Sequence, residues 1–253
     1  MMSTGPRFFC PAPLAPGMTL ELPEGAARHV QVLRLQPGAS ITLFGASSLA
    51  PIGGEYTATV MAMGRQSVQV LVGAHAPIER ETQRTLHLAI GIPANERMDW
   101  LVEKATELGV ASIQPLMTER TVVRLDAQRG LKKVAHWQSI AVAACEQCGR
   151  NRIPVIHEPL ALTRWFQHRR AAVLPRDAAT LVLSLQPGSR DLRDWSTDPA
   201  RQMLNVTFLC GPEGGVGVAE EALALADGFQ PVSLGTRVLR SETAALAALT
   251  LLS

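Results

Sequence analysis

The apolar positions in the first 75 residues follow the short-period pattern of β-strands. Three runs rich in β-branched residues, ITLFG (41–45), EYTATVMAM (55–63) and SVQVLVG (67–73), are separated by turn sequences such as PGAS and APIGG. Short strands between Gly, Pro and Ser turns are typical of a small barrel or sandwich. The polar stretch 76–85 contains a proline and predicts a linker. We therefore expect one domain at 1–75 and another at 76–253.

From Leu86 onward, apolar runs of strand length alternate with stretches whose apolar residues have helical spacing. The run LHLAIGI precedes the helical stretch MDWLVEKATELG, and SIQPLM precedes a long helical stretch that ends at Gly149. The alternation continues through IPVI, LTRWFQHRR, TLVLSL, VTFLC, a helix at 218–227, PVSLG and a final helix from Ser241. This pattern predicts an α/β fold with a mostly parallel sheet, helices on both faces, and ligands at the carboxyl ends of the strands.

Composition narrows the class of protein. No apolar run reaches the roughly 20 residues that span a bilayer, and the N-terminus lacks a secretory signal, so we expect a cytoplasmic protein with no membrane partner. The four cysteines are too few for a disulfide scaffold. Cys145 and Cys148 form a CxxC inside a helical stretch without a second ligand pair, so we expect packed thiols and no metal site.

The charge distribution is more informative than the net charge of +2. Between Glu119 and Arg152, seven basic residues accompany three acidic ones. Such a local excess favours a phosphate-backbone partner, but a solvated helix face explains it equally well.

Three polar loops follow predicted strands and should meet at one edge of the sheet: 184–189, 210–215 and 234–243. The middle loop, CGPEGG, has neither the Lys-Ser/Thr ending of a phosphate loop nor GxGxxG, so a ligand bound through phosphate alone is disfavoured. Its three glycines permit close approach of a flat group. In the third loop, Arg237 and Arg240 flank apolar residues, which suits an adenine-type base.

Several segments resemble one known family. GPEGG followed by a helix and then SLGTRVLRSETAALAAL closely resembles the signature of SPOUT-class methyltransferases, specifically the RsmE family, which methylates N3 of a uridine in small-subunit ribosomal RNA. NERMDWLVEKATELGV (95–110), IAVAACEQCGRNRIP (140–154) and RHVQVLRLQPGASITLFG (28–45) are similar to that family as well. Together they cover essentially the whole chain, which makes the resemblance specific.

The resemblance implies a PUA-like β-barrel followed by an α/β domain with a trefoil knot. It also implies S-adenosylmethionine as cofactor, a homodimer, and 16S ribosomal RNA or the assembled 30S subunit as substrate. The cofactor-binding residues that it implies are Ser184, Leu185, Gly211, Glu213, Gly214, Gly215, Leu234, Gly235, Val238, Leu239, Arg240 and Thr243.

The chemistry of the implied reaction suggests the catalytic residues. Uridine N3 carries a proton at neutral pH, so a site must stabilise its anion or accept the proton. Arg240 and Arg237 can do the first. Glu242 or Glu213 can do the second, although Glu242 in a first helical turn also fits a helix-dipole role.

Six arginines are expected to position RNA through its phosphates: Arg7, Arg28, Arg34, Arg97, Arg120 and Arg150. For Arg150 an ion pair with Glu146, four residues earlier on the same helix, is an equal alternative. Two other functions stay open. One is a SPOUT enzyme acting on ribose 2′-OH or transfer RNA, and the other is a noncatalytic RNA-binding assembly factor.

Overall fold

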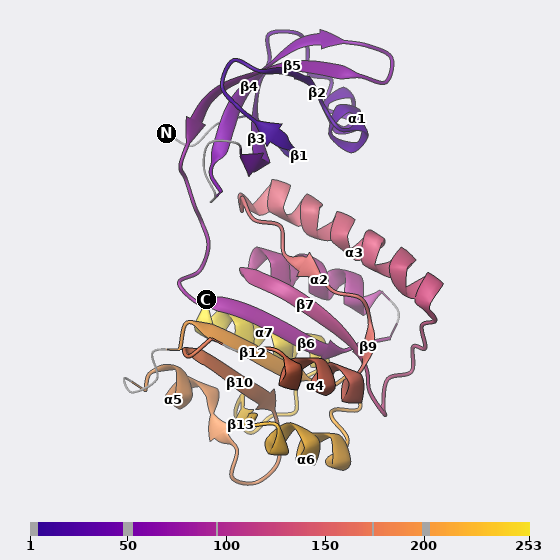
Figure 1. The fold of residues 1–253 in the computed structure, drawn as a ribbon, viewed down its shortest axis with the longest axis vertical. Coiled ribbons are helices and arrows are strands. Elements are labelled where there is room, and N and C mark those ends of the chain that lie inside the picture. The colour runs from indigo at the N-terminus through magenta and orange to yellow at the C-terminus, as the bar shows by residue number, and fades with distance from the viewer. Residues whose placement is uncertain (1–4, 48–52, 95, 174, 199–202) are drawn as a thin grey trace. The chain divides into compact units, whose positions relative to one another are not determined.

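The computed structural model describes residues 5–47, 53–94, 96–173, 175–198 and 203–253. The chain divides into two compact units, each built around a sheet of its own (Figure 1). Unit 1 comprises Met1–Glu81 and Cys145–Ile153, and unit 2 comprises Thr82–Ala144 and Pro154–Ser253. The first unit therefore extends past the expected boundary at residue 75 and includes a segment from the middle of the chain.

Unit 1 is a five-stranded sheet in the order β1-β3-β4-β5-β2 with one helix. Its elements are β1 (Arg7–Leu14), β2 (Thr19–Glu21), α1 (Glu24–Val32), β3 (Ser40–Ser47), β4 (Glu55–Met63) and β5 (Val68–Ala76). β1 runs parallel to β3, and the other pairs are antiparallel. The sheet curls around buried Phe8, Leu43 and Val70, and α1 adds Ala27 and Val30 to this core.

The segment 145–153 joins unit 1 through hydrogen bonds between residues that are far apart in the sequence. Arg7 donates to the carbonyl of Gly149 at 3.1 Å and to Oδ1 of Asn151 at 2.7 Å. Asn151 in turn donates to the carbonyl of Ile78 at 2.7 Å. A buried polar side chain needs such partners, so these contacts explain why the segment belongs with the β-domain.

Unit 2 contains an eight-stranded sheet in which every pairing is parallel, as the strand and helix alternation predicts. The order is β11-β13-β10-β12-β6-β7-β8, and β9 also pairs with β7. The strands are β6 (Thr85–Gly91), β7 (Val110–Met117), β8 (Val155–Ile156), β9 (Leu160–Ala161), β10 (Ala178–Leu183), β11 (Arg190–Asp191), β12 (Asn205–Cys210) and β13 (Gln230–Ser233).

Helices cover both faces of this sheet (Figure 1). They are α2 (Arg97–Glu107), α3 (Ala127–Cys148), α4 (Leu162–Ala171), α5 (Leu192–Ser196), α6 (Val218–Ala226) and α7 (Ser241–Leu252). On one face, Trp165 of α4 and Ala224 of α6 pack with Val182 and Leu209 of the sheet. On the other face, α7 packs on β12 and β6 and against α2. In the sheet, β10 lies between β13 and β12. Because α7 packs on β12 and β6, the chain after β13 must pass β10 to reach α7.

Candidate functional site

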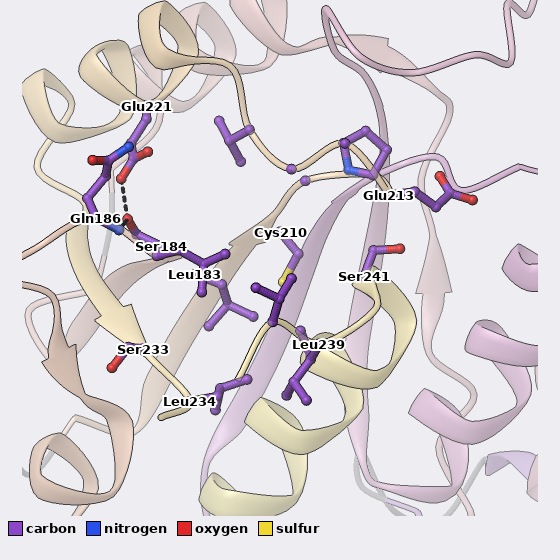
Figure 2. A pocket seen from close by; sticks show the side chains of 18 of the residues that line it. Leu183, Ser184, Gln186, Cys210, Glu213, Glu221, Ser233, Leu234, Leu239 and Ser241 are labelled. Carbon is purple, nitrogen blue, oxygen red and sulfur yellow. Dashed lines mark hydrogen bonds between the residues drawn. The ribbon is translucent and has the colours of Figure 1, made fainter. Parts of the chain in front are cut away.

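The loops after β10, β12 and β13 meet at one edge of the sheet and enclose a cavity of about 310 Å³ (Figure 2). The three strands are parallel and pair in register, so their carboxyl ends lie together. Apolar side chains form much of the wall, among them Leu183, Leu234 and Leu239. Apolar walls with a few placed polar groups are typical of small-molecule sites.

The polar groups of the cavity are organised around Ser184, which is only 7% exposed. Its hydroxyl donates to Oε1 of Glu221 at 2.5 Å and accepts the backbone N–H of Gln186 at 3.0 Å (Figure 2). Glu221 lies on the first turns of α6, directly after the glycine-rich loop. One hydroxyl thus connects the loop after β10 to α6, and the Glu221 carboxylate faces the cavity.

Two glycines of the loop after β12 are required by the loop itself. A Cβ on Gly211 would lie 2.2 Å from the carbonyl carbon of Gly215, and Gly215 has a φ of +74°. Gly91 at the end of β6 is equally constrained, because a Cβ there would lie 2.7 Å from the nitrogen of Pro212. From the sequence these glycines were expected to allow close approach of a flat group. In the structure, backbone packing requires a glycine at 211 and the positive φ favours one at 215.

Glu213 lines the cavity, and its carboxylate ties the loop after β12 to the start of α2 (Figure 2). Its Oε1 accepts hydrogen bonds from the backbone N–H of Ala94 at 2.9 Å and from Nη1 of Arg97 at 3.0 Å. Nε of Arg97 also lies 4.0 Å from Oε1 of Glu242, which is 7% exposed. Arg97 therefore lies between two carboxylates that the sequence marked as site residues.

Nine of the twelve expected cofactor residues line the cavity. They are Ser184, Leu185, Gly211, Glu213, Gly214, Gly215, Leu234, Val238 and Leu239. The exposed Arg237 lines it too. Gly235, Arg240 and Thr243 do not; Arg240 is the exposed N-cap residue of α7, and Thr243 lies on that helix's first turn.

Sequence reasoning missed several lining residues. Glu221, Gln186 and Ser233 line the cavity, and so does Arg120, which donates to the carbonyl of Gly214. Arg120 was expected only as an RNA contact. It follows β7, another parallel strand whose carboxyl end lies at the same edge, and that position was the available signal.

Two of the expected RNA-contacting arginines lie in a buried polar network of unit 1. Arg150 is 4% exposed and pairs with Glu81 at 2.5 Å, and Arg7 pairs with Glu55. α3 ends at Cys148, and Gly149 has a φ of +89°, so Arg150 lies beyond the helix and lacks the helical spacing to Glu146. These two arginines are therefore not part of the RNA surface proposed below. Arg28 and Arg34 are exposed, on α1 and just after it.

The cysteines are free, and Cys10, Cys145 and Cys210 are buried. Burial raises the pKa of the Cys210 thiol, although this residue lines the cavity, so the neutral form predominates. In the part of the chain that the structure describes, no group of three His, Cys, Asp or Glu side chains is placed to hold a metal ion. None of the helices described there has the length and hydropathy of a membrane span.

Comparison with known proteins gives the family. The model of the RNA methyltransferase domain matches residues 80–253. Ribosomal RNA small subunit methyltransferase E of Synechocystis sp. is 31% identical over 91% of this chain and 71% of its own length. The same enzyme of Bacillus subtilis is 30% identical over 88% and 85%. The chain belongs to the RsmE family of RNA methyltransferases.

Two solved structures with bound S-adenosylmethionine are similar to nearly the whole chain. A methyltransferase of Legionella pneumophila in complex with S-adenosylmethionine has a TM-score of 0.87 and 37% identity, covering 99% of this chain and 97% of its own. RsmE of Neisseria gonorrhoeae bound to S-adenosylmethionine has a TM-score of 0.84 and 33% identity, covering 97% and 95%. This chain thus shares its fold with both proteins, and its family with the Neisseria enzyme.

Proposed function

We propose that this chain transfers the methyl group of S-adenosylmethionine to N3 of a uridine in 16S ribosomal RNA, within the assembled 30S subunit in the cytoplasm. As a member of the RsmE family it is an RNA methyltransferase. The observation that carries the proposal is the cavity at the ends of β10, β12 and β13, in a chain similar to solved proteins from Legionella and Neisseria that contain S-adenosylmethionine.

The lining of the cavity fits this cofactor. Leu183, Leu234 and Leu239 offer apolar walls to an adenine ring, while the loop backbone offers donors and acceptors to its edge. The Ser184 and Glu221 pair offers hydrogen-bond partners to ribose hydroxyls or to an ammonium group. Bound S-adenosylmethionine would supply an electrophilic methyl group on a sulfonium sulfur.

The protein must make uridine N3 nucleophilic and align it with that methyl group. A base would have to take the N3 proton, so that the N3 electron pair could bond the methyl group; the cofactor would lose that methyl group and leave as S-adenosylhomocysteine. We assign stabilisation of the uracil anion to Arg240 and Arg237, which are exposed on the segment between β13 and α7. Glu242 is the proposed proton acceptor, because it lies two residues beyond Arg240 and within 4.0 Å of Arg97.

We also propose that unit 1 is a PUA-like RNA-binding domain, that unit 2 contains a trefoil knot, and that the protein acts as a homodimer. The curled five-stranded sheet supports the first proposal. The second is supported by the path after β13, because this strand lies beyond β10 while α7 packs on β12 and β6. Arg28 and Arg34, exposed around α1, are the proposed phosphate contacts of unit 1.

One experiment separates the proposed function from the two others that the sequence leaves open, another SPOUT enzyme and a noncatalytic assembly factor. The purified protein is titrated with S-adenosylmethionine by calorimetry and then incubated with the labelled cofactor and small subunits that lack the methyl group. We expect cofactor binding and label in 16S ribosomal RNA. Transfer only to transfer RNA would indicate another SPOUT enzyme, and the absence of cofactor binding would indicate a noncatalytic assembly factor.

A further inference from the structure

A second cavity, of about 830 Å³, opens at the N-terminal end of α2. Its lining residues come from the segments before α2, at the start of α2, before α3 and on α3, and they are Ile92, Pro93, Glu96, Arg97, Met98, Asp99, Trp100, Val123, Leu125, Lys133 and Trp137. Ile92, Met98 and Leu125 give it apolar walls. Its size lies within the range of ligand sites. None of the residues assigned above to the cofactor or to catalysis lines it.

Trp100 gives this cavity an aromatic surface. Its side chain is 46% exposed, whereas the three other tryptophans are between 1% and 8% exposed. A half-exposed indole costs free energy in water unless something covers it. Any nucleobase can stack on an indole face, which makes Trp100 a suitable platform for a base.

Two carboxylates (Glu96 and Asp99) and two cations (Arg97 and Lys133) line the cavity, and an excess of cations lies in the neighbouring stretch 119–133. Asp99 is already engaged, because it accepts hydrogen bonds from Nε1 of Trp137 at 2.9 Å and Nε2 of His136 at 2.7 Å. Lys133 lines the cavity and is exposed. The stretch 119–133 carries five exposed cations and two exposed carboxylates, and its exposed cations are Arg120, Arg124, Arg129, Lys132 and Lys133. Such an excess attracts a phosphate backbone.

The second cavity adjoins the first through one ion pair. Arg97 lines the second cavity and donates to Glu213, which belongs to the loop that lines the first. An RNA strand that places one nucleotide at the cofactor would therefore bring a neighbouring nucleotide to the second cavity. The target base must leave its stack to react, so its neighbours lose stacking partners as well.

We propose that this cavity binds an unstacked RNA nucleotide next to the target uridine, with its base on Trp100 and its phosphate at Lys133. The assignment rests on the proposed function, since it takes RNA as the substrate. The cavity would be a second RNA subsite of the enzyme. Its apolar walls and the indole of Trp100 would contact the base, and Lys133 would bind the phosphate. Trp100 and Lys133 would thus determine how tightly the RNA is held and leave the binding of S-adenosylmethionine unaffected.

Four variants test this subsite: Trp100→Ala, Trp100→Phe, Lys133→Ala and Lys132→Ala. Their affinity for small subunits lacking the methyl group is measured by co-sedimentation with S-adenosylhomocysteine, so that no turnover is needed. We expect Trp100→Ala to weaken binding about tenfold or more, and Trp100→Phe to stay within about threefold of the parent, since a phenyl ring still stacks. Cofactor affinity, measured by calorimetry, should not change.

The lysine pair separates the cavity from general surface charge. Lys133→Ala should weaken subunit binding and reduce the slope of log affinity against log salt concentration by about one. Lys132 precedes Lys133 but does not line the cavity, so Lys132→Ala should have the smaller effect. If the Trp100→Ala variant binds subunits as tightly as the parent, the proposal is wrong. The proposal is also wrong if light scattering shows that this variant has half the mass of the parent in solution, because the cavity would then bind a second copy of the chain. If the parent binds subunits with the expected pattern but transfers no methyl group, the proposed function fails and the subsite stands.

Discussion

Nη1 of Arg97 lies 3.0 Å from Oε1 of Glu213, and this ion pair ties the first turn of α2 to the glycine-rich loop after β12. The same carboxylate oxygen accepts the backbone N–H of Ala94. Glu213, which lines the cavity, therefore holds the conformation of the loop after β12. The sequence suggested Glu213 and Glu242 as proton acceptors at N3. Because Oε1 of Glu213 already accepts these two hydrogen bonds, the proposed function assigns that role to Glu242.

Replacing Glu213 with alanine should weaken S-adenosylmethionine binding by roughly threefold to tenfold, because the loop loses both contacts that hold its conformation. The melting temperature should change little, since both side chains are partly exposed and such pairs contribute about 1 kcal/mol or less. Calorimetry measures the binding effect. In a double-mutant cycle with Arg97→Ala the two losses should be less than additive, and full additivity would contradict the coupling.

Gly211→Ala should abolish cofactor binding, because the new Cβ would lie 2.2 Å from the backbone of Gly215 and the loop would have to open. Gly214→Ala is the matched comparison in the same loop. Its Cβ would meet only the Arg120 side chain at 3.1 Å, and that side chain can move. We expect at least a tenfold difference in dissociation constant between the two variants. Equal affinities would show that the loop tolerates rearrangement.

Arg240→Ala and Arg237→Ala should separate chemistry from cofactor binding. Arg237 lines the cavity and Arg240 does not. Arg240→Ala should therefore lower kcat by about a hundredfold or more while leaving the affinity for S-adenosylmethionine and the mass in solution unchanged. Arg237→Ala should weaken cofactor binding as well. Near-normal turnover of Arg240→Ala would refute its role as the group that stabilises the uracil anion.

The buried carboxyl of Glu55 should make unit 1 sensitive to acid. Burial opposes its charge, but hydrogen bonds from Arg80 and Arg7 outweigh burial and hold its pKa below the usual range. Its contribution to stability is thus complete above the unfolded-state pKa of about 4.3 and is lost as pH falls through the lower folded-state value. Glu55→Gln should cost about 2–4 kcal/mol at pH 7, measured by denaturant unfolding, because two arginines lose their ionic partner.

The pH profile distinguishes this ionic effect from a packing effect. Below about pH 4.3 the difference in unfolding free energy between Glu55→Gln and the parent should shrink, because the parent's carboxyl also becomes neutral. A constant difference at every pH would contradict an ionic role for Glu55. The comparison needs no assumption about the remaining carboxylates, since they are the same in both proteins.

The parallel sheet and the edge where its ligand site lies could be predicted from the sequence because both follow from local patterns. Alternating apolar runs identify β10, β12 and β13, and parallel strands necessarily place their carboxyl ends together. Most lining residues follow from this geometry. β1 and α1 were missed, since β1 carries Pro11 and Pro13, which interrupt a strand pattern, and α1 is a single short helix after Pro23.

Tertiary partners were beyond the reach of sequence patterns. Arg97 and Glu213 are 116 positions apart, and nothing local to either residue predicts the other as its partner. The same holds for the segment 145–153, which belongs to unit 1 through Arg7 and Asn151 and not through any feature of its own pattern. Arg150 was expected to lie on a helix, but the helix ends before Gly149.

The position of the transferred methyl group tests the central claim most directly. Small subunits lacking the modification are incubated with the protein and S-adenosylmethionine, and the nucleosides of the 16S ribosomal RNA are identified by mass spectrometry against 3-methyluridine and 2′-O-methyluridine standards. The proposed function predicts one equivalent of 3-methyluridine per subunit. A methyl group on ribose, or on any base atom other than uracil N3, would contradict it.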